Sequence, residues 1–182
     1  TTIKVLQEEI AKGENISGAE KEVLHYREAL MYGYNFLAEK NPIYTNFIVD
    51  IQKRIEPNKS WIRKNNDTVI SKIEKWKATP IYTPPQWEKT LREYLHNLDE
   101  FINNDQDELH PLIKAGIIHY QFECIHPFMD GNGRVGRILV ILYLISKHKL
   151  EYPILFLSQY INKNKSKYYQ IFQKAHKTND IT

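Results

Sequence analysis

The sequence contains few of the features that mark secreted, membrane or nucleic-acid-binding proteins. One cysteine among 182 residues excludes a disulfide within the chain, which is typical of a reducing compartment, so we expect a cytoplasmic protein. No apolar run reaches the roughly 20 residues of a transmembrane helix, and the first residues lack the apolar core of a signal peptide, so we expect no membrane partner. The formal net charge of +3 is too small to predict nucleic-acid binding by this domain.

What is present fits one globular domain, residues 1–182. Hydrophobic residues make up 42% and charged residues 26% of the chain, and the length suffices to bury one sizeable core. Apolar residues recur at helical spacing, which predicts an all-α fold, and Ser17 with Glu20 forms a capping box at the start of the first helix. The expected helices cover roughly residues 23–37, 44–55, 85–102, 108–120, 135–145 and 165–175. The segment 135–145 is apolar nearly all round, which predicts a central buried helix.

One region departs from the helical pattern. Between residues 58 and 83 the sequence has a turn signal, Asn65-Asn66-Asp67, and two short β-favouring pieces at 68–70 and 81–83, the second followed by two prolines. These pieces are too short for the core of a sheet. We predict a small β-hairpin at the surface.

A glycine-containing turn, HPFMDGNGRVGR from residue 126, precedes the predicted central helix. Gly131 and Gly133 tolerate positive φ, so the backbone N–H groups of residues 131–134 can point inward together and bind an anion. The start of a helix adds unpaired amides and its dipole. Arg134 and Arg137 are neighbours on one helix face, and because cations disfavour a helix start, they indicate a bound polyanion.

The residues before the turn supply the chemistry. Asp130 would be repelled by a bare phosphate, and one carboxylate together with phosphate oxygens is a usual way to hold Mg²⁺. His126 can accept a proton near neutral pH. Pro127 and Phe128 are interpreted as structural residues that stiffen the loop and anchor it in the core. The twelve residues therefore predict a site that holds a phosphate ester and attacks it.

A dinucleotide-binding turn is one alternative. Gly131, Gly133 and Gly136 also spell GxGxxG. That turn normally leaves a strand directly, whereas a helical pattern and five further residues precede it here.

Two further alternatives use other side chains. His119, Glu123 and His126 fall at i, i+4 and i+7 and could share a helical face as metal ligands, although Pro127 is expected to end that helix and the arginines would have no role. Cys124 is a candidate nucleophile with His126, but residues two apart on a helix do not face each other.

The segment 126–137 resembles the Fic motif HPFx(D/E)GNGRxxR at every specified position. Residues 112–123 and 153–158 are also similar to Fic-domain sequences, and the similarity extends from about residue 22 onward. The resemblance implies a Fic-type helical bundle and transfer of a nucleotide, most often AMP from ATP, to a Ser, Thr or Tyr hydroxyl of a target protein. It also implies that His126 is the base, that Asp130 binds Mg²⁺, and that the phosphates are held by Gly131, Asn132, Gly133, Arg134 and Arg137.

The resemblance further implies where the target and the nucleotide base bind. In Fic proteins a hairpin flap beside the site pairs through its edge with the target backbone, and the matching residues here are Thr79, Pro80, Ile81 and Tyr82. Pro80 lacks the N–H of an ideal pairing strand. Tyr168 and Tyr169 match a segment near the base and sugar, whereas His176 stands roughly where relatives often have an Asn.

Many Fic proteins carry an inhibitory helix, [S/T]xxxE[G/N]. In this chain the Glu followed by Gly or Asn is Glu14, and Ile10 stands where Ser or Thr is required. We therefore expect a chain trimmed from a longer protein, with inhibition released by the trimming. Relatives that transfer phosphate, UMP or phosphocholine, or that remove AMP, use nearly the same motif. A non-catalytic nucleotide sensor is another alternative, and a homodimer is left open.

Overall fold

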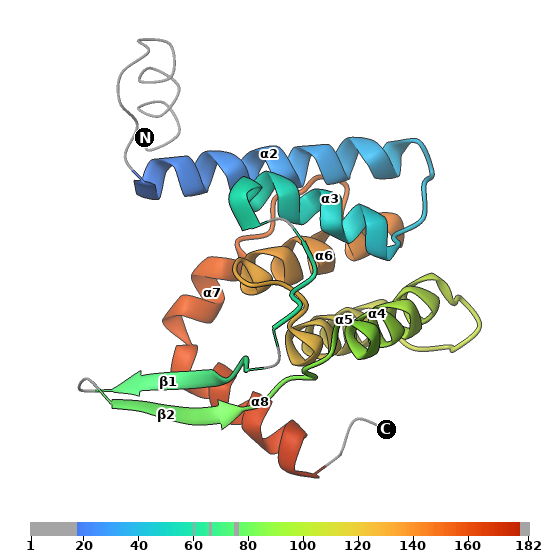
Figure 1. Cartoon of the computed structure of the whole chain (residues 1–182). Helices are drawn as coiled ribbons and strands as arrows, with labels where there is room; N and C mark the ends of the chain where they lie inside the picture. The colour runs from blue at the N-terminus through green and yellow to red at the C-terminus, as the bar shows by residue number, and fades with distance from the viewer. Residues whose placement is uncertain (1–17, 60, 66, 75–76, 179–182) are drawn as a thin grey trace.

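The computed structural model describes residues 18–59, 61–65, 67–74 and 77–178. It is a bundle of helices with a small hairpin at one end (Figure 1). The helices are α2 Gly18–Ala38, α3 Thr45–Ile55, α4 Glu88–Asn103, α5 Pro111–Ile125, α6 Asn132–Ser146, α7 Leu157–Lys163 and α8 Lys165–Thr178, with a 3-10 turn, η1, at Pro57–Lys59. The strands are β1 Ile70–Glu74 and β2 Lys77–Tyr82. The predicted all-α bundle with a hairpin is confirmed.

Helix α6 is the central helix of the bundle. It contacts α5, α2 and α3, and α4 packs on α5, so α6 is covered from several sides (Figure 1). Its buried residues include Val135, Ile138 and Leu142, all fully buried. On α2, Gly33 allows a close approach, because a Cβ there would lie 2.4 Å from a methyl of Leu142. The nearly uniform apolar surface of α6 thus led to the correct prediction of its central position.

The hairpin is antiparallel, but its strands differ from the predicted pieces. Ile70 pairs with Tyr82 and Ser71 pairs with Pro80, so a bulge interrupts the register between the two pairs. The strand does not include Thr68, because the Gln86 side chain donates to the Thr68 carbonyl and accepts from its N–H, both at 3.1 Å. These two hydrogen bonds replace the ladder that the β propensity of residues 68–70 predicted.

Several helix boundaries also differ from the predictions. Helix α4 begins at Glu88 instead of Pro85, since the Pro85 carbonyl accepts a hydrogen bond from Arg63 instead of a helical one. Helix α5 begins at Pro111, after His110. Helix α7 was not predicted, because seven residues of mixed polarity give little periodic signal. The predicted capping residue Ser17 and the segment around Glu14 lie outside the described residues.

No helix in the described part of the chain combines the length and the apolar character needed to cross a bilayer.

Candidate active site

Helix α5 ends at His126, which adopts a left-handed conformation with φ 47° and ψ 58°. Its N–H still donates to the Phe122 carbonyl at 3.0 Å, so the turn closes the helix and aims the next residues away from it. Positive φ is uncommon for a residue with a side chain. Such strain persists only where surrounding contacts hold it, and it is frequent at functional sites.

The loop after His126 is held by an asparagine. Asn132 is 2% exposed; its Oδ1 accepts from the Phe128 N–H at 2.9 Å and its Nδ2 donates to the Phe128 carbonyl at 2.7 Å. The Phe128 ring is 1% exposed and lies 6.2 Å from the Phe122 ring. Both polar atoms of Asn132 are therefore used to close the loop between Phe128 and the start of α6.

A second chain segment pairs with this loop from outside the motif. Ile62 forms an isolated antiparallel bridge with Phe128, and the Arg63 N–H donates to the Pro127 carbonyl at 2.9 Å. On another side, Gln52 of α3 donates from Nε2 to the Asp130 carbonyl at 2.7 Å. The loop therefore receives hydrogen bonds from two segments that lie far from it in sequence.

The turn has the geometry of an anion site. Gly131 adopts φ 77° and precedes the first residue of α6, and its N–H donates to Asp130 Oδ1 at 2.7 Å. The next two N–H groups, those of Asn132 and Gly133, donate to no residue that the structure describes. Unpaired amides at a helix start, with the positive end of the dipole, attract phosphate.

Charged side chains surround the turn. Lys59 lies 2.9 Å from Asp130 Oδ2, and this hydrogen-bonded ion pair holds the pKa of Asp130 below its usual range. Arg134 is bound to Glu56 at 2.5 Å and lies 3.6 Å from Glu22. Neither Asp130 nor Arg134 lines the cavity described next.

A cavity of about 330 Å³ opens between the motif, the hairpin and the last two helices. Its wall includes His126, Gly133 and Arg137 from the motif and Glu123 from α5. The rest of the wall comes from Ile70, Tyr82, Ile161, Asn162, Lys165, Tyr168, Tyr169 and Phe172. The Tyr168 hydroxyl lies 3.0 Å from His119 Nε2, which ties α8 to α5 behind the cavity.

Buried polar atoms on this wall have no partner. Glu123 Oε1, His126 Nδ1 and Arg137 Nε are sealed from solvent and make no hydrogen bond of good geometry in the described part of the chain, although the Glu123 main chain lies close enough to His126 to raise its pKa. Buried polar groups in proteins are nearly always paired. Three of the eight such atoms in the described part of the chain belong to residues that line this one cavity.

Burial tunes the titratable groups of the site. It lowers the pKa of His126 to about 4, and the Arg63 charge acts in the same direction. Burial also lowers the pKa of His119 to about 4 and raises that of Glu123 to about 7, although Arg137 opposes the latter shift. At neutral pH the His126 ring is therefore uncharged, with one ring nitrogen free of a proton, and burial makes it a weaker base than free imidazole.

A model of one protein family, described as Fic/DOC, matches residues 42–144, more than half of the chain, and the match includes the motif. The chain belongs to the Fic/DOC family. The protein adenylyltransferase Fic of Nematostella vectensis is 30% identical over 124 residues, which are 65% of this chain and 27% of that protein. That of Drosophila grimshawi is 25% identical over 180 residues, 96% of this chain and 34% of that protein. The chain thus spans about a quarter to a third of the length of these relatives.

Solved structures share the fold. A Fic family protein from Desulfovibrio desulfuricans G20 superposes with a TM-score of 0.72 at 21% identity, covering 96% of this chain and 52% of that one. Fic-1 from C. elegans superposes with a TM-score of 0.60 at 23% identity, covering 78% of this chain and 42% of that one. At these identities the structural comparison supports a shared fold and nothing more.

The residues predicted for the Fic site divide into those that line the cavity and those that do not. The structure brings His126, Gly133, Arg137, Tyr168 and Tyr169 together on the cavity wall. Asp130, Gly131, Asn132 and Arg134 lie at the turn but not on that wall, and the side chains of Asn132 and Arg134 are occupied by protein partners. Of the predicted flap residues Tyr82 lines the cavity, and Ile70 of β1 lines it as well. Thr79 and Pro80 lie in β2 and are exposed, and the side chains of Ile81 and His176 lie outside the described residues, as does Asn15 with the rest of the inhibitory-motif candidate.

Sequence reasoning missed four residues that support the Fic site. Arg63, Gln52 and Glu56 hold the loop and the first arginine from outside the motif, and Glu123 was weighed only as a metal ligand. Arg63 and Gln52 are fully buried, but polar side chains carry no periodic signal that predicts burial.

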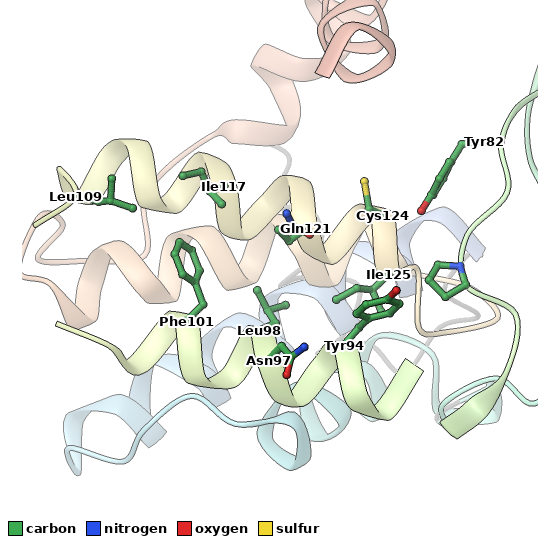
Figure 2. A pocket seen from close by; sticks show the side chains of 11 residues that line it. Tyr82, Tyr94, Asn97, Leu98, Phe101, Leu109, Ile117, Gln121, Cys124 and Ile125 are labelled. Atoms are coloured by element: carbon green, nitrogen blue, oxygen red, sulfur yellow. The ribbon is translucent and has the colours of Figure 1, made fainter. Parts of the chain in front are cut away.

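Cys124 faces a different cavity from the one beside His126. A pocket of about 690 Å³ lies between α4 and α5, lined by both helices and by Tyr82. In Figure 2 the Cys124 thiol and the Tyr82 ring lie at one end of this pocket. Burial raises the pKa of Cys124 to about 11, so the thiol stays protonated and a poor nucleophile at neutral pH.

The donor set beside the turn fits a magnesium ion held jointly with phosphate. The described residues contain no group of three acidic, histidine or cysteine side chains arranged as metal ligands, so an all-protein metal cage is not formed. Asp130 has a carboxylate that is 46% exposed and already carries a cation, the half-exposed Lys59 ammonium. One carboxylate with the rest of the shell from phosphate and water is the usual arrangement for Mg²⁺.

Proposed function

We propose that this chain is a protein adenylyltransferase that moves AMP from ATP to a hydroxyl side chain of a target protein. The observation that carries the proposal is the cavity wall beside the start of α6, where an uncharged imidazole, an arginine and a carboxyl lie together and each has one buried polar atom without a hydrogen bond. The names of the relatives support the same activity at the level of the family. The target and the hydroxyl-bearing residue are not specified by these observations.

The chain's residues divide the reaction between them. His126 removes the proton from the target hydroxyl, whose oxygen forms a bond to the α-phosphorus as the bond to the β-phosphate oxygen breaks and pyrophosphate leaves. The unpaired amides of Asn132 and Gly133 stabilise negative charge on the phosphate oxygens. Arg137 holds the outer phosphates from the next turn of α6, and Arg134 joins it when its ion pair with Glu56 opens.

Asp130 is the residue that would hold Mg²⁺ together with the phosphates, in exchange for Lys59. A bound divalent cation neutralises part of the charge of the triphosphate. Tyr168 and Tyr169 line the same cavity as the motif, where their rings would contact the base and sugar. Tyr82, another lining residue, ends strand β2, which would place a target segment paired with the hairpin next to His126.

The direct test is transfer of label from ATP to proteins of a cell lysate, with Mg²⁺ present. Label from the α-phosphate is expected on protein and label from the γ-phosphate is not; the reverse result would indicate phosphate transfer, and neither label would favour nucleotide sensing. His126→Ala should abolish labelling while calorimetry still detects ATP binding. His96→Ala is the matched control, since His96 is exposed on α4 and does not line the cavity. Unchanged labelling by His126→Ala would exclude the role of the base.

A further inference from the structure

Arg63 is a buried cation without an acidic partner. It is 0% exposed, and no carboxylate lies within ion-pair distance of it among the residues that the structure describes. Its guanidinium donates to three main-chain carbonyls instead: from Nε to His126 at 2.8 Å, from one terminal nitrogen to Asn65 at 3.3 Å, and from the other to Pro85.

Burying a charge away from water and without a counter-ion is expensive, and burial lowers the pKa of Arg63 itself. An apolar side chain of similar length would fill the same space at lower cost. Only a guanidinium, however, presents several N–H donors in a fixed planar fork. The arrangement is therefore explained by the geometry that it imposes on the three carbonyls.

The three carbonyls belong to the catalytic loop and to both ends of the hairpin. His126 is the strained residue at the end of α5. Asn65 lies before β1 and Pro85 lies after β2. One side chain thus ties the backbone of the proposed base to the two chain segments from which the hairpin projects.

We propose that Arg63 is a positioning residue that fixes His126 in its left-handed conformation and couples it to the hairpin. The inference rests on the proposed function in one respect: the hairpin is where a target segment would pair. A target that docks on the hairpin would then change the orientation of His126 through the planar guanidinium of Arg63. Arg63 does not itself touch the cavity wall.

The charges around His126 agree with this role. The Arg63 cation disfavours protonation of the ring, whereas Asp130 and the main chain at Glu123 act in the opposite direction. Glu123 and Arg137 face the same cavity. Removing the Arg63 charge is therefore expected to raise the pKa of His126, in addition to loosening its backbone.

The test compares Arg63→Met and Arg63→Lys with wild type. The pKa of His126 is followed by NMR on protein with ¹³C-labelled histidine, its signal assigned by its loss in His126→Gln. Arg63→Met should raise this pKa. Arg63→Lys keeps the charge but not the fork, so it should leave the pKa low while reducing kcat for AMP transfer at an unchanged KM for ATP.

Lys114→Met is the matched control. Lys114 is also a buried cation bonded to a main-chain carbonyl, that of Asn104, but unlike Arg63 it is paired with a carboxylate, that of Asp107 at 2.5 Å. It lies at the other end of α5, about 18 Å from His126 at 1.5 Å per residue. Lys114→Met should lower the melting temperature without changing the pKa of His126. An Arg63→Met variant that melts lower but keeps the wild-type pKa would reduce Arg63 to a structural residue and overturn the inference.

The remaining outcomes separate the two proposals. If Arg63→Met does not fold, wild-type kcat in Arg63→Lys overturns the inference. If wild type transfers no AMP while Arg63→Met still raises the pKa of His126, the proposed function fails and only the contact between the Arg63 charge and His126 stands. If wild type transfers AMP and both variants match it in kcat and pKa, the function stands and the inference fails.

Discussion

Replacing Asn132 by alanine tests whether this motif residue acts through the loop or through the nucleotide. The substitution removes two hydrogen bonds, of 2.9 and 2.7 Å, and leaves the N–H and the carbonyl of Phe128 unpaired at a site where Asn132 is 2% exposed. An unsatisfied buried polar group costs about 1–3 kcal/mol, so the two together predict a loss of roughly 2–6 kcal/mol. Alanine is a good helix former, so the loss does not arise from α6 itself. It is a large share of the 5–15 kcal/mol typical of a domain.

Urea unfolding followed by circular dichroism measures this loss as a lower midpoint at an unchanged slope. Asn164→Ala is the control: Asn164 also donates from Nδ2 to a carbonyl, that of Tyr160, but in an exposed position, where water replaces the bond. We expect a change within about 0.5 kcal/mol there. If Asn132→Ala were as stable as this control, the loop would not depend on Asn132, and direct contact with the nucleotide would become the better explanation.

Two other predictions concern the packing around the site. Lowering the pH from about 6.5 to about 4 should reduce the free energy of unfolding, because His119 and His126 have native pKa values of about 4 while unfolded histidines take up protons near pH 6.5. Glu123, with a native pKa of about 7, acts in the opposite direction and offsets about one of the two histidines. Urea midpoints measured at stepped pH check this, and His119→Gln should flatten part of the dependence; a flat wild-type profile would contradict the burial of these rings. Gly136→Ala should lower the melting temperature, since a Cβ there would lie 2.6 Å from Glu123 Oε1 and 3.1 Å from the Phe122 ring. Gly116→Ala meets open space and should be neutral or stabilising by up to about 1 kcal/mol; equal effects of the two changes would refute the close contact of α5 and α6.

The sequence predicted those parts of the site that are near one another along the chain. The turn at Gly131, the start of α6 and His126 before it all lie within the twelve residues of the motif, so local backbone geometry brings them together in any fold that forms the helix. The burial of α6 was also predictable, because a helix that is apolar nearly all round has no face suited to water.

The partners of the motif were not predictable, because they come from distant segments. Glu56 binds Arg134 across 78 positions in the sequence, and Arg63 bonds to His126 across 63. The sequence does not distinguish a buried arginine or glutamine from an exposed one, because polar residues do not contribute to the hydrophobic periodicity that predicts burial. The β propensity of Thr68 was likewise overridden by hydrogen bonds from the Gln86 side chain, whereas Ile70 of the same piece does begin β1.

The chain's amino-acid order by itself determined the family, the helical class and the local chemistry of one turn, because these depend on periodicity and on contiguous residues. Only the tertiary structure decided which motif side chains face the cavity, that Arg134 is held by Glu56, and that His126 is neutral and fastened by Arg63. Those properties arise from burial and from contacts between segments far apart in sequence. Whether a side chain is charged, or has a free hydrogen-bonding atom, depends on which residues pack against it.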